Sequence, residues 1–105
     1  MAKKSPTELS LMELRKTYPL VQKTEYWNGF ARKRVDLFGF IDIVAVSDHT
    51  IGVQCTSDSN VSSRVNKIME EKDALRTLKK AGWKIQVWGW KKKDGRLVNR
   101  IVEIL

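Results

Sequence analysis

Two short apolar runs decide the fold: Phe40-Ile41-Asp42-Ile43-Val44-Ala45-Val46 and Ile51-Gly52-Val53-Gln54-Cys55-Thr56. The turn signal Ser47-Asp48-His49-Thr50 separates them, so the pair predicts a β-hairpin. With a loop of three or five residues, Asp42 lies opposite Gln54 or Thr56, and these polar side chains share one face of the sheet. The other face is expected to carry Ile41, Ile43, Ile51, Val53 and Cys55. Because polar groups on an apolar hairpin are costly to bury without a partner, the pattern favours a bound hard metal ion.

The composition indicates one basic domain. The chain has 105 residues, 42% of them hydrophobic, and no linker or repeat divides it, so residues 1–105 are expected to form a single domain. A net charge of +8 favours a polyanion as partner, either nucleic acid or an anionic membrane surface. No apolar segment approaches the roughly 20 residues of a membrane span, and the N-terminus lacks the apolar core of a signal peptide. We therefore expect a soluble protein of the cytoplasm or another intracellular compartment. A single cysteine and a single histidine exclude a zinc site built from these residue types.

The flanking segments alternate between helical and strand patterns. The capping box Ser5-Pro6-Thr7-Glu8 begins a helix that is expected to run to about Thr17. A second helix is expected from about Val61 to Lys80, ended by Gly82. Strands are expected over 20–27, 84–90 and 97–105, with a turn at 94–95 joining the last two. The predicted order is helix, three strands, helix, two strands, which indicates an α/β fold with a central mixed sheet flanked by helices, because the second helix is a crossover.

The hairpin and the order of elements also carry a resemblance to a known family. The run Gly39-Phe40-Ile41-Asp42-Ile43-Val44-Ala45, followed by Gln54-Cys55-Thr56, resembles the PD-(D/E)XK nuclease superfamily, and within it the archaeal-type Holliday junction resolvases. The resemblance implies a restriction-endonuclease-like core and metal-dependent hydrolysis of DNA phosphodiester bonds, with Mg²⁺ or Mn²⁺ as cofactor. Asp42 matches the first aspartate of the motif. Gln54 stands where the second acid belongs, and Thr56 stands where the lysine belongs.

The resemblance implies roles for the residues of the hairpin and of the helix after it. Asp42, the amide oxygen of Gln54 and the main-chain carbonyl of Cys55 would hold the ion, with water completing the octahedron that Mg²⁺ requires. Thr56 cannot carry a positive charge, so Arg64 or Lys67 would supply the cation. In an alternative interpretation, Asp42 and Gln54 form only a buried hydrogen-bonded pair.

Three further carboxylates are candidates for the site. Asp36 is a rival to Asp42 as the first aspartate, a ligand for a second metal ion, or the salt-bridge partner of Arg32 or Arg34. Glu13 and Glu25 are candidate extra ligands, because the superfamily often takes a glutamate from its first helix. For Glu13, a solvated helix face is the plainer interpretation.

The basic residues indicate how a nucleic acid would bind. The phosphate backbone is expected to contact two basic runs and one helical residue: Arg32-Lys33-Arg34, Lys91-Lys92-Lys93 and Arg64. A chain this short favours recognition of a nick, branch or junction over a long sequence. Symmetric cutting would require a homodimer, for which the tryptophan-rich strand 84–90 is a candidate interface. Two alternatives stay open, a catalytically inactive nuclease fold that binds DNA or assembles with partners, and an RNA-binding domain. Whether the host is a cell or a virus also stays open.

Overall fold

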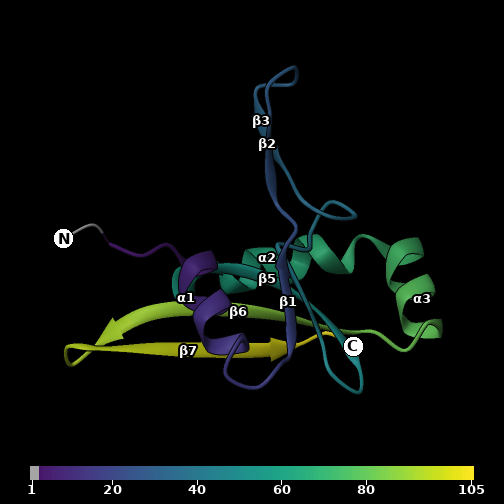
Figure 1. Ribbon diagram of the computed structural model, residues 1–105. Coiled ribbons are helices and arrows are strands. Elements are labelled where there is room, and N and C mark those ends of the chain that lie inside the picture. The colour runs from purple at the N-terminus through teal and green to yellow at the C-terminus, as the bar shows by residue number, and fades with distance from the viewer. Residues whose placement is uncertain (1–2) are drawn as a thin grey trace.

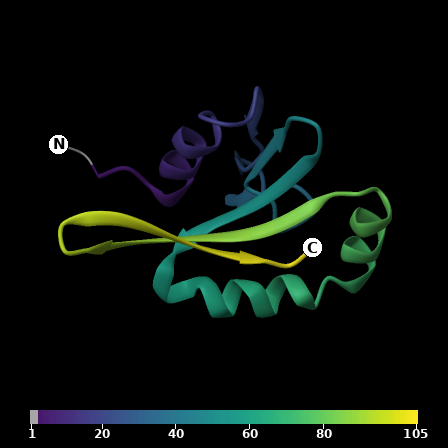
Figure 2. The same cartoon turned by 90° about the horizontal axis from the view of Figure 1, so that it is seen from below.

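The computed structural model describes residues 3–105 and has an α/β fold of three layers (Figures 1 and 2). Met1 and Ala2, which the single-domain prediction includes, lie outside the described residues. The central sheet has the strand order β1-β4-β5-β6-β7, with bounds Leu20–Lys23, Ile43–Val46, Thr50–Ser57, Lys84–Lys93 and Arg96–Glu103. The helix α1 (Pro6–Leu14) packs on one face, and α2 (Val61–Met69) and α3 (Lys72–Lys80) belong to the other. A short 3₁₀ helix, η1 (Asp58–Asn60), precedes α2.

The predicted mixed sheet is confirmed. Strands β5 and β6 are parallel, and every other pair of neighbouring strands in the central sheet is antiparallel. The crossover between β5 and β6 runs through η1, α2 and α3. The turn Asp94-Gly95 has positive φ at both residues, 53° and 77°, as a two-residue hairpin turn requires.

The central hairpin forms in the expected register. Val46 pairs with Thr50, which leaves a three-residue loop, and Ile43 pairs with Val53. The side chains of Ile43, Val53 and Cys55 pack with Leu14 of α1. Ile41 is an exception to the prediction, since it belongs to the core on the opposite face. It precedes β4, in a turn where the alternation of a strand does not apply, and the missing side chain of Gly52 leaves the space that its Cδ1 fills.

The segment 20–27 is not the single strand that its pattern predicts. The main-chain N–H groups of Thr24 and Glu25 both donate to the carbonyl of Asp42, and here the chain leaves the edge of the central sheet. The next residues form β2 (Tyr26–Asn28), which pairs with β3 (Lys33–Val35) as a separate two-stranded sheet. The basic run Arg32-Lys33-Arg34 therefore belongs to a ribbon that projects from the body (Figure 1).

The predicted helices begin where expected but end differently. The Oγ of Ser5 caps α1 by accepting a hydrogen bond from the N–H of Glu8, but the helix ends at Leu14 and not near Thr17. The segment 61–80 forms two helices with a break at Glu70 and Glu71. The break turns α3 around the end of the sheet, so that its leucines fill the same core as Ile68 of α2 (Figure 2). Among residues 3–105, no helix is long and apolar enough to cross a membrane.

The tryptophan-rich strand cannot form a dimer by pairing edge to edge with a second copy. β6 lies between β5 and β7, inside the sheet, so both of its edges are already paired. Trp88 is buried against the α1 side, and the Nε1 of Trp90 donates to the Oγ of Ser10 in α1 at 2.8 Å. The two tryptophans therefore join the sheet to α1.

Candidate metal centre

Three carboxylates meet beside the central hairpin. Glu25, Asp36 and Asp42 each offer an oxygen atom, and these three atoms lie within 4.8 Å of one another. Glu25 precedes β2, Asp36 follows β3 and Asp42 precedes β4. The centre therefore forms where the two-stranded ribbon joins the central sheet.

A tight turn brings the two aspartates together. Leu37 and Ile41 form an isolated antiparallel bridge, so the residues just outside it, Asp36 and Asp42, face each other. The turn requires positive φ at Phe38 (55°) and at Gly39 (84°). Glycine adopts this conformation without steric cost, which explains its position midway between the two acids.

Glu25 is held in place by its own hydrogen bonds. Its main-chain N–H donates to the carbonyl of Asp42 at 3.3 Å, and its Oε1 accepts a hydrogen bond of 3.0 Å from the hydroxyl of Thr7 in α1. The Nη1 of Arg34 lies 3.5 Å from the same Oε1. Three separate parts of the chain, α1, β3 and the turn before β4, thus fix this carboxylate.

Asp42 lies at the buried end of the centre. Only 2% of its surface is exposed, and its Oδ2 accepts two hydrogen bonds of 2.8 Å, from the Nε2 of Gln54 and the main-chain N–H of Cys55. Burial raises the pKa of Asp42 from 3.8 to about 8; the Cys55 hydrogen bond opposes the rise, while the charges of Asp36 and Glu25 add to it. Without a bound cation, burial and the two neighbouring acids therefore favour the protonated form of Asp42.

This arrangement fits a divalent cation. The one ion pair in the cluster joins Arg34 to Glu25, whereas burial favours the protonated form of Asp42, the most buried of the three acids. Carboxylate oxygens are the ligands that Mg²⁺ and Mn²⁺ prefer, and a metal ion would displace that proton. Among the residues the structure describes, Glu25, Asp36 and Asp42 are the ones that would hold it.

The predicted contact between Asp42 and Gln54 is present, but its chemistry differs from a shared metal ligation. Gln54 is 4% exposed and directs its amide nitrogen, not its oxygen, toward the Asp42 carboxylate. The alternative of a buried hydrogen-bonded pair is therefore the arrangement observed, and Gln54 orients Asp42. Ligation through the carbonyl of Cys55 stays a prediction, since the contact the structure shows is made by its N–H group.

In the part of the chain that the structure describes, neither Thr56 nor the two predicted cations bonds to the carboxylates. Thr56 is buried and pairs in register with Gly89 of β6. A Cβ atom at Gly89 would clash with the side chain of Val61 in α2. Within residues 3–105, no hydrogen bond or ion pair joins Thr56, Arg64 or Lys67 to the carboxylate cluster. The cation next to the carboxylates is Arg34, because β3 pairs with β2 and carries Arg34 past Glu25.

The structure also bears on the predictions for Glu13 and Asp36. Glu13 pairs with Lys16 on the surface of α1 at 3.0 Å, which confirms the solvated-face interpretation. In the described part of the chain, no ion pair joins Asp36 to Arg32 or Arg34, since Arg34 pairs with Glu25. The sequence patterns indicated only minor roles for Glu25 and Arg34, as a candidate extra ligand and a phosphate contact. The turn pair Asn28-Gly29 between residues of strand type was the available signal for the ribbon that unites them.

Solvent reaches the centre from the side of Glu25. A hollow of about 330 Å³ opens there, lined by Ser5, Thr7, Glu8, Leu11, Lys23, Glu25 and Arg34. Asp36 and Glu25 are half-buried, whereas Asp42 is covered. A ligand that enters the hollow would meet Glu25 and Arg34 first.

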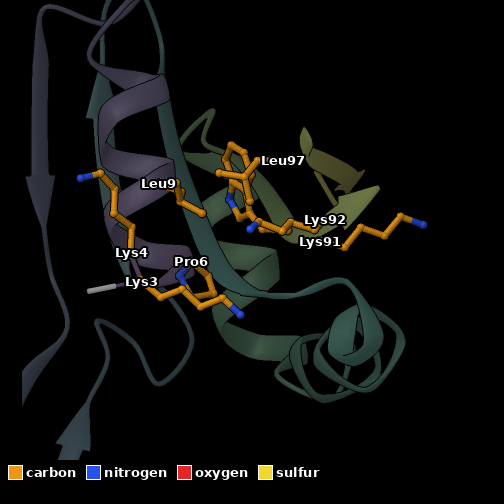
Figure 3. A pocket seen from close by; sticks show the side chains of 8 residues that line it. Lys3, Lys4, Pro6, Leu9, Lys91, Lys92 and Leu97 are labelled. Atoms are coloured by element: carbon orange, nitrogen blue, oxygen red, sulfur yellow. The ribbon is translucent and has the colours of Figure 1, made fainter. Parts of the chain in front are cut away.

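A second hollow lies on the other side of the N-terminal end of α1. It measures about 310 Å³ and has an apolar floor that includes Pro6, Leu9 and Leu97, with lysines from two segments around it (Figure 3). Lys3 and Lys4 approach from the N-terminal segment, and Lys91 and Lys92 from the end of β6. Lys91 also lies 3.9 Å from Asp58, and Lys93 is exposed at the end of the same strand. The predicted basic run 91–93 thus lies on the surface, where a phosphate backbone can reach it.

The comparisons with known proteins add no relatives. No protein-family model matches the chain, and no curated protein or solved structure is significantly similar to it. The function must therefore be inferred from the residues and their geometry.

Proposed function

We propose that this protein is a metal-dependent endonuclease of the PD-(D/E)XK type that hydrolyses phosphodiester bonds of DNA with Mg²⁺ or Mn²⁺. The observation that carries the proposal is the approach of Glu25, Asp36 and Asp42 to within 4.8 Å at the base of a basic ribbon. The proposal requires both the carboxylates and the basic residues beside them. Carboxylates hold the metal ion, and neighbouring cations attract the polyanion.

Each residue of the centre has a role in this proposal. Glu25, Asp36 and Asp42 would hold the ion, and when bound it would supply Lewis-acid activation of the phosphate and of the attacking water. Gln54 and the N–H of Cys55 orient the Asp42 carboxylate from behind. Arg34, whose side chain is mostly exposed, can exchange its contact with Glu25 for a bidentate contact with a phosphate.

The charge distribution supports DNA as the substrate. Twenty lysines and arginines stand against twelve acids, and three of those acids are gathered in the centre itself. Basic residues flank both hollows beside α1, from Lys23 and Arg34 to Lys91 and Lys92. Binding to the backbone should therefore weaken steeply as salt rises.

Cleavage tests the proposal directly. Supercoiled plasmid and a labelled four-way junction would be incubated with the protein in Mg²⁺, in Mn²⁺ and in EDTA. We expect nicking or cutting only with metal, and a loss of about 100-fold or more for Asp36→Asn and Asp42→Asn. Glu13→Gln is the control, because Glu13 is a surface acid that pairs with Lys16 and lies outside the centre.

A catalytically inactive DNA-binding or assembly module is the second candidate function. Two observations favour it: Thr56 stands where the superfamily has its lysine, and Gln54 faces Asp42 as a hydrogen-bond donor. Retained DNA binding in EDTA, with no cleavage of any substrate in either metal, would support the module and reject the enzyme. A homodimer, which symmetric cutting would require, is tested by sedimentation velocity of the same protein.

A further inference from the structure

The ribbon formed by β2 and β3 presents exposed aromatic side chains away from the body of the protein. Residues 26–35, here called the arm, project from the molecule (Figure 1). Trp27 is 63% exposed in β2, and Phe30 is fully exposed in the turn between the strands. Burying such side chains is strongly favourable, so large exposed aromatic groups at the end of a projecting element indicate a binding partner.

The tip of the arm is an ordered turn. The Oδ1 of Asn28 accepts hydrogen bonds from the N–H groups of Phe30, at 3.0 Å, and Ala31, at 3.1 Å. Arg32 completes the turn with a positive φ of 50°. Phe30 is thus held in an exposed position before any partner arrives, which lowers the entropic cost of binding.

One face of the arm leads directly to the carboxylates. Trp27 lies opposite Arg34 in the register of β2 and β3. Trp27 and Arg34 therefore share a face of the arm, and the Nη1 of Arg34 lies 3.5 Å from the Oε1 of Glu25 in the carboxylate cluster. Two residues of a strand span about 7 Å, so a group stacked on Trp27 would lie close to the candidate metal centre.

The positive charge of the arm favours a nucleic acid as its partner. Residues 26–35 contain Arg32, Lys33 and Arg34 and no acidic residue. A second copy of the arm would bring like charges together, whereas a nucleic-acid strand offers phosphates for the cations and flat bases for the aromatic rings. In an intact duplex the bases are stacked on one another, so free base faces are available only where pairing is interrupted.

We propose that the arm binds unpaired bases at a branch, bulge or junction in DNA, with Trp27 and Phe30 stacking on the bases and Arg32 and Lys33 contacting the phosphates beside them. The inference deepens the proposed function by naming its substrate class. It rests on that function for cleavage but not for binding, so binding is measured separately.

The first experiment compares DNA binding with and without unpaired bases. Fluorescence anisotropy in EDTA would give the affinity for a plain duplex and for the same duplex with a three-nucleotide bulge. We expect Trp27→Ala and Phe30→Ala to weaken binding to the bulged DNA by about 5- to 100-fold and binding to the duplex by less than about twofold. Tyr26→Ala is the matched control, since Tyr26 is an aromatic residue of the same arm, 56% exposed, on the opposite face.

A second measurement reports the stacking itself. The fluorescence of 2-aminopurine placed in the bulge should change when the wild-type protein binds, and this change should be lost with Trp27→Ala or Phe30→Ala. Circular dichroism and thermal melts would show that each variant is folded. Because both aromatic side chains are exposed, neither substitution should disturb the core.

Four outcomes would overturn the inference. If Trp27→Ala and Phe30→Ala weaken binding to both DNAs equally, the arm is a general contact to the backbone. If neither variant weakens binding to either DNA, the two aromatic side chains have no role in binding. A change from dimer to monomer in Trp27→Ala or Phe30→Ala would identify a second copy as the occupant. Selective binding to the bulge without cleavage in any metal would reject the endonuclease and support the arm, whereas cleavage that is insensitive to Trp27 and Phe30 would do the reverse.

Discussion

The Nε2 of Gln54 donates a hydrogen bond of 2.8 Å to the Oδ2 of Asp42, between two side chains that are both buried. The pair joins β5 to the turn before β4, next to the carboxylates of Asp36 and Glu25. Gln54 supplies a hydrogen-bond donor at the position where the superfamily that the motif resembles has an acid. In the absence of metal, this donor and the main-chain N–H of Cys55 stabilise a carboxyl group that lies beside two other acids.

Gln54→Glu should therefore trade stability for metal affinity. It removes a donor to Asp42 and adds a fourth carboxyl group, so we expect the metal-free protein to lose about 1–3 kcal/mol of unfolding free energy at pH 7. The extra charge should tighten Mn²⁺ binding by about tenfold or more. Denaturant unfolding in EDTA and calorimetric titration with Mn²⁺ measure the two effects. If neither quantity changes, Gln54 has no part in the centre.

The pKa of Asp42 predicts how the stability of the metal-free protein depends on pH. Because the folded pKa of about 8 lies above the ordinary value of 3.8, the folded state binds more protons between these values. The contribution is complete below about pH 4 and is lost as the pH rises through 8. Between pH 6 and 9, the wild type should lose on the order of 2–3 kcal/mol that Asp42→Asn does not lose.

Denaturant unfolding in EDTA at several pH values, with Asp42→Asn alongside, isolates this contribution from those of other titrating groups. Parallel pH profiles for the two proteins would contradict a raised pKa. With Mn²⁺ at saturation, the wild-type profile should flatten, because the metal ion replaces the proton.

Gly89 should not tolerate a side chain. A Cβ at this position in β6 would collide with the Cγ2 of Val61 and lie 3.1 Å from the main chain of Asp58. We expect Gly89→Ala to cost about 1–3 kcal/mol, because η1 and the start of α2 must shift. Gly29→Ala is the control, since no atom lies within 4 Å of a Cβ there. Thermal melts of both variants test this, and equal melting temperatures would refute the close packing of α2 on β6.

Ser10 joins α1 to the sheet through Trp90. Its hydroxyl accepts a hydrogen bond of 2.8 Å from the Nε1 of Trp90 and donates one of 2.7 Å to the carbonyl of Pro6. Ser10→Ala leaves the indole N–H unsatisfied, so we expect a loss of about 1–3 kcal/mol. Trp90→Phe removes the donor as well and should recover part of the loss when combined with Ser10→Ala. A double-mutant cycle of unfolding free energies measures this coupling, and additive losses would contradict it.

Several features of the fold and the site could be predicted from local patterns. The alternation of the two apolar runs predicted that Asp42 lies opposite Gln54 or Thr56, and the three-residue loop of the structure selects Gln54. The capping box correctly predicted the start of α1, and Asp94-Gly95 correctly predicted the turn between β6 and β7. The periodicity of 61–80 continues across the break at Glu70 and Glu71, so the sequence predicted one helix where there are two.

The amino-acid sequence by itself determined the hairpin, the crossover that makes the sheet mixed, and the approach of Asp42 to the polar residues of β5, because these depend on hydrogen bonds and hydrophobic alternation that local patterns report. Only the tertiary structure decided which acids meet. Glu25 reaches Asp42 because the chain leaves the sheet at Thr24, and Asp36 reaches it because residues 37–41 close a tight turn. The first bend depends on hydrogen bonds from Thr24 and Glu25 to Asp42, which are far apart in the sequence, so no local pattern reports it. The second is a local turn at Gly39, but it builds the centre only because the first bend brings Glu25 to the same place.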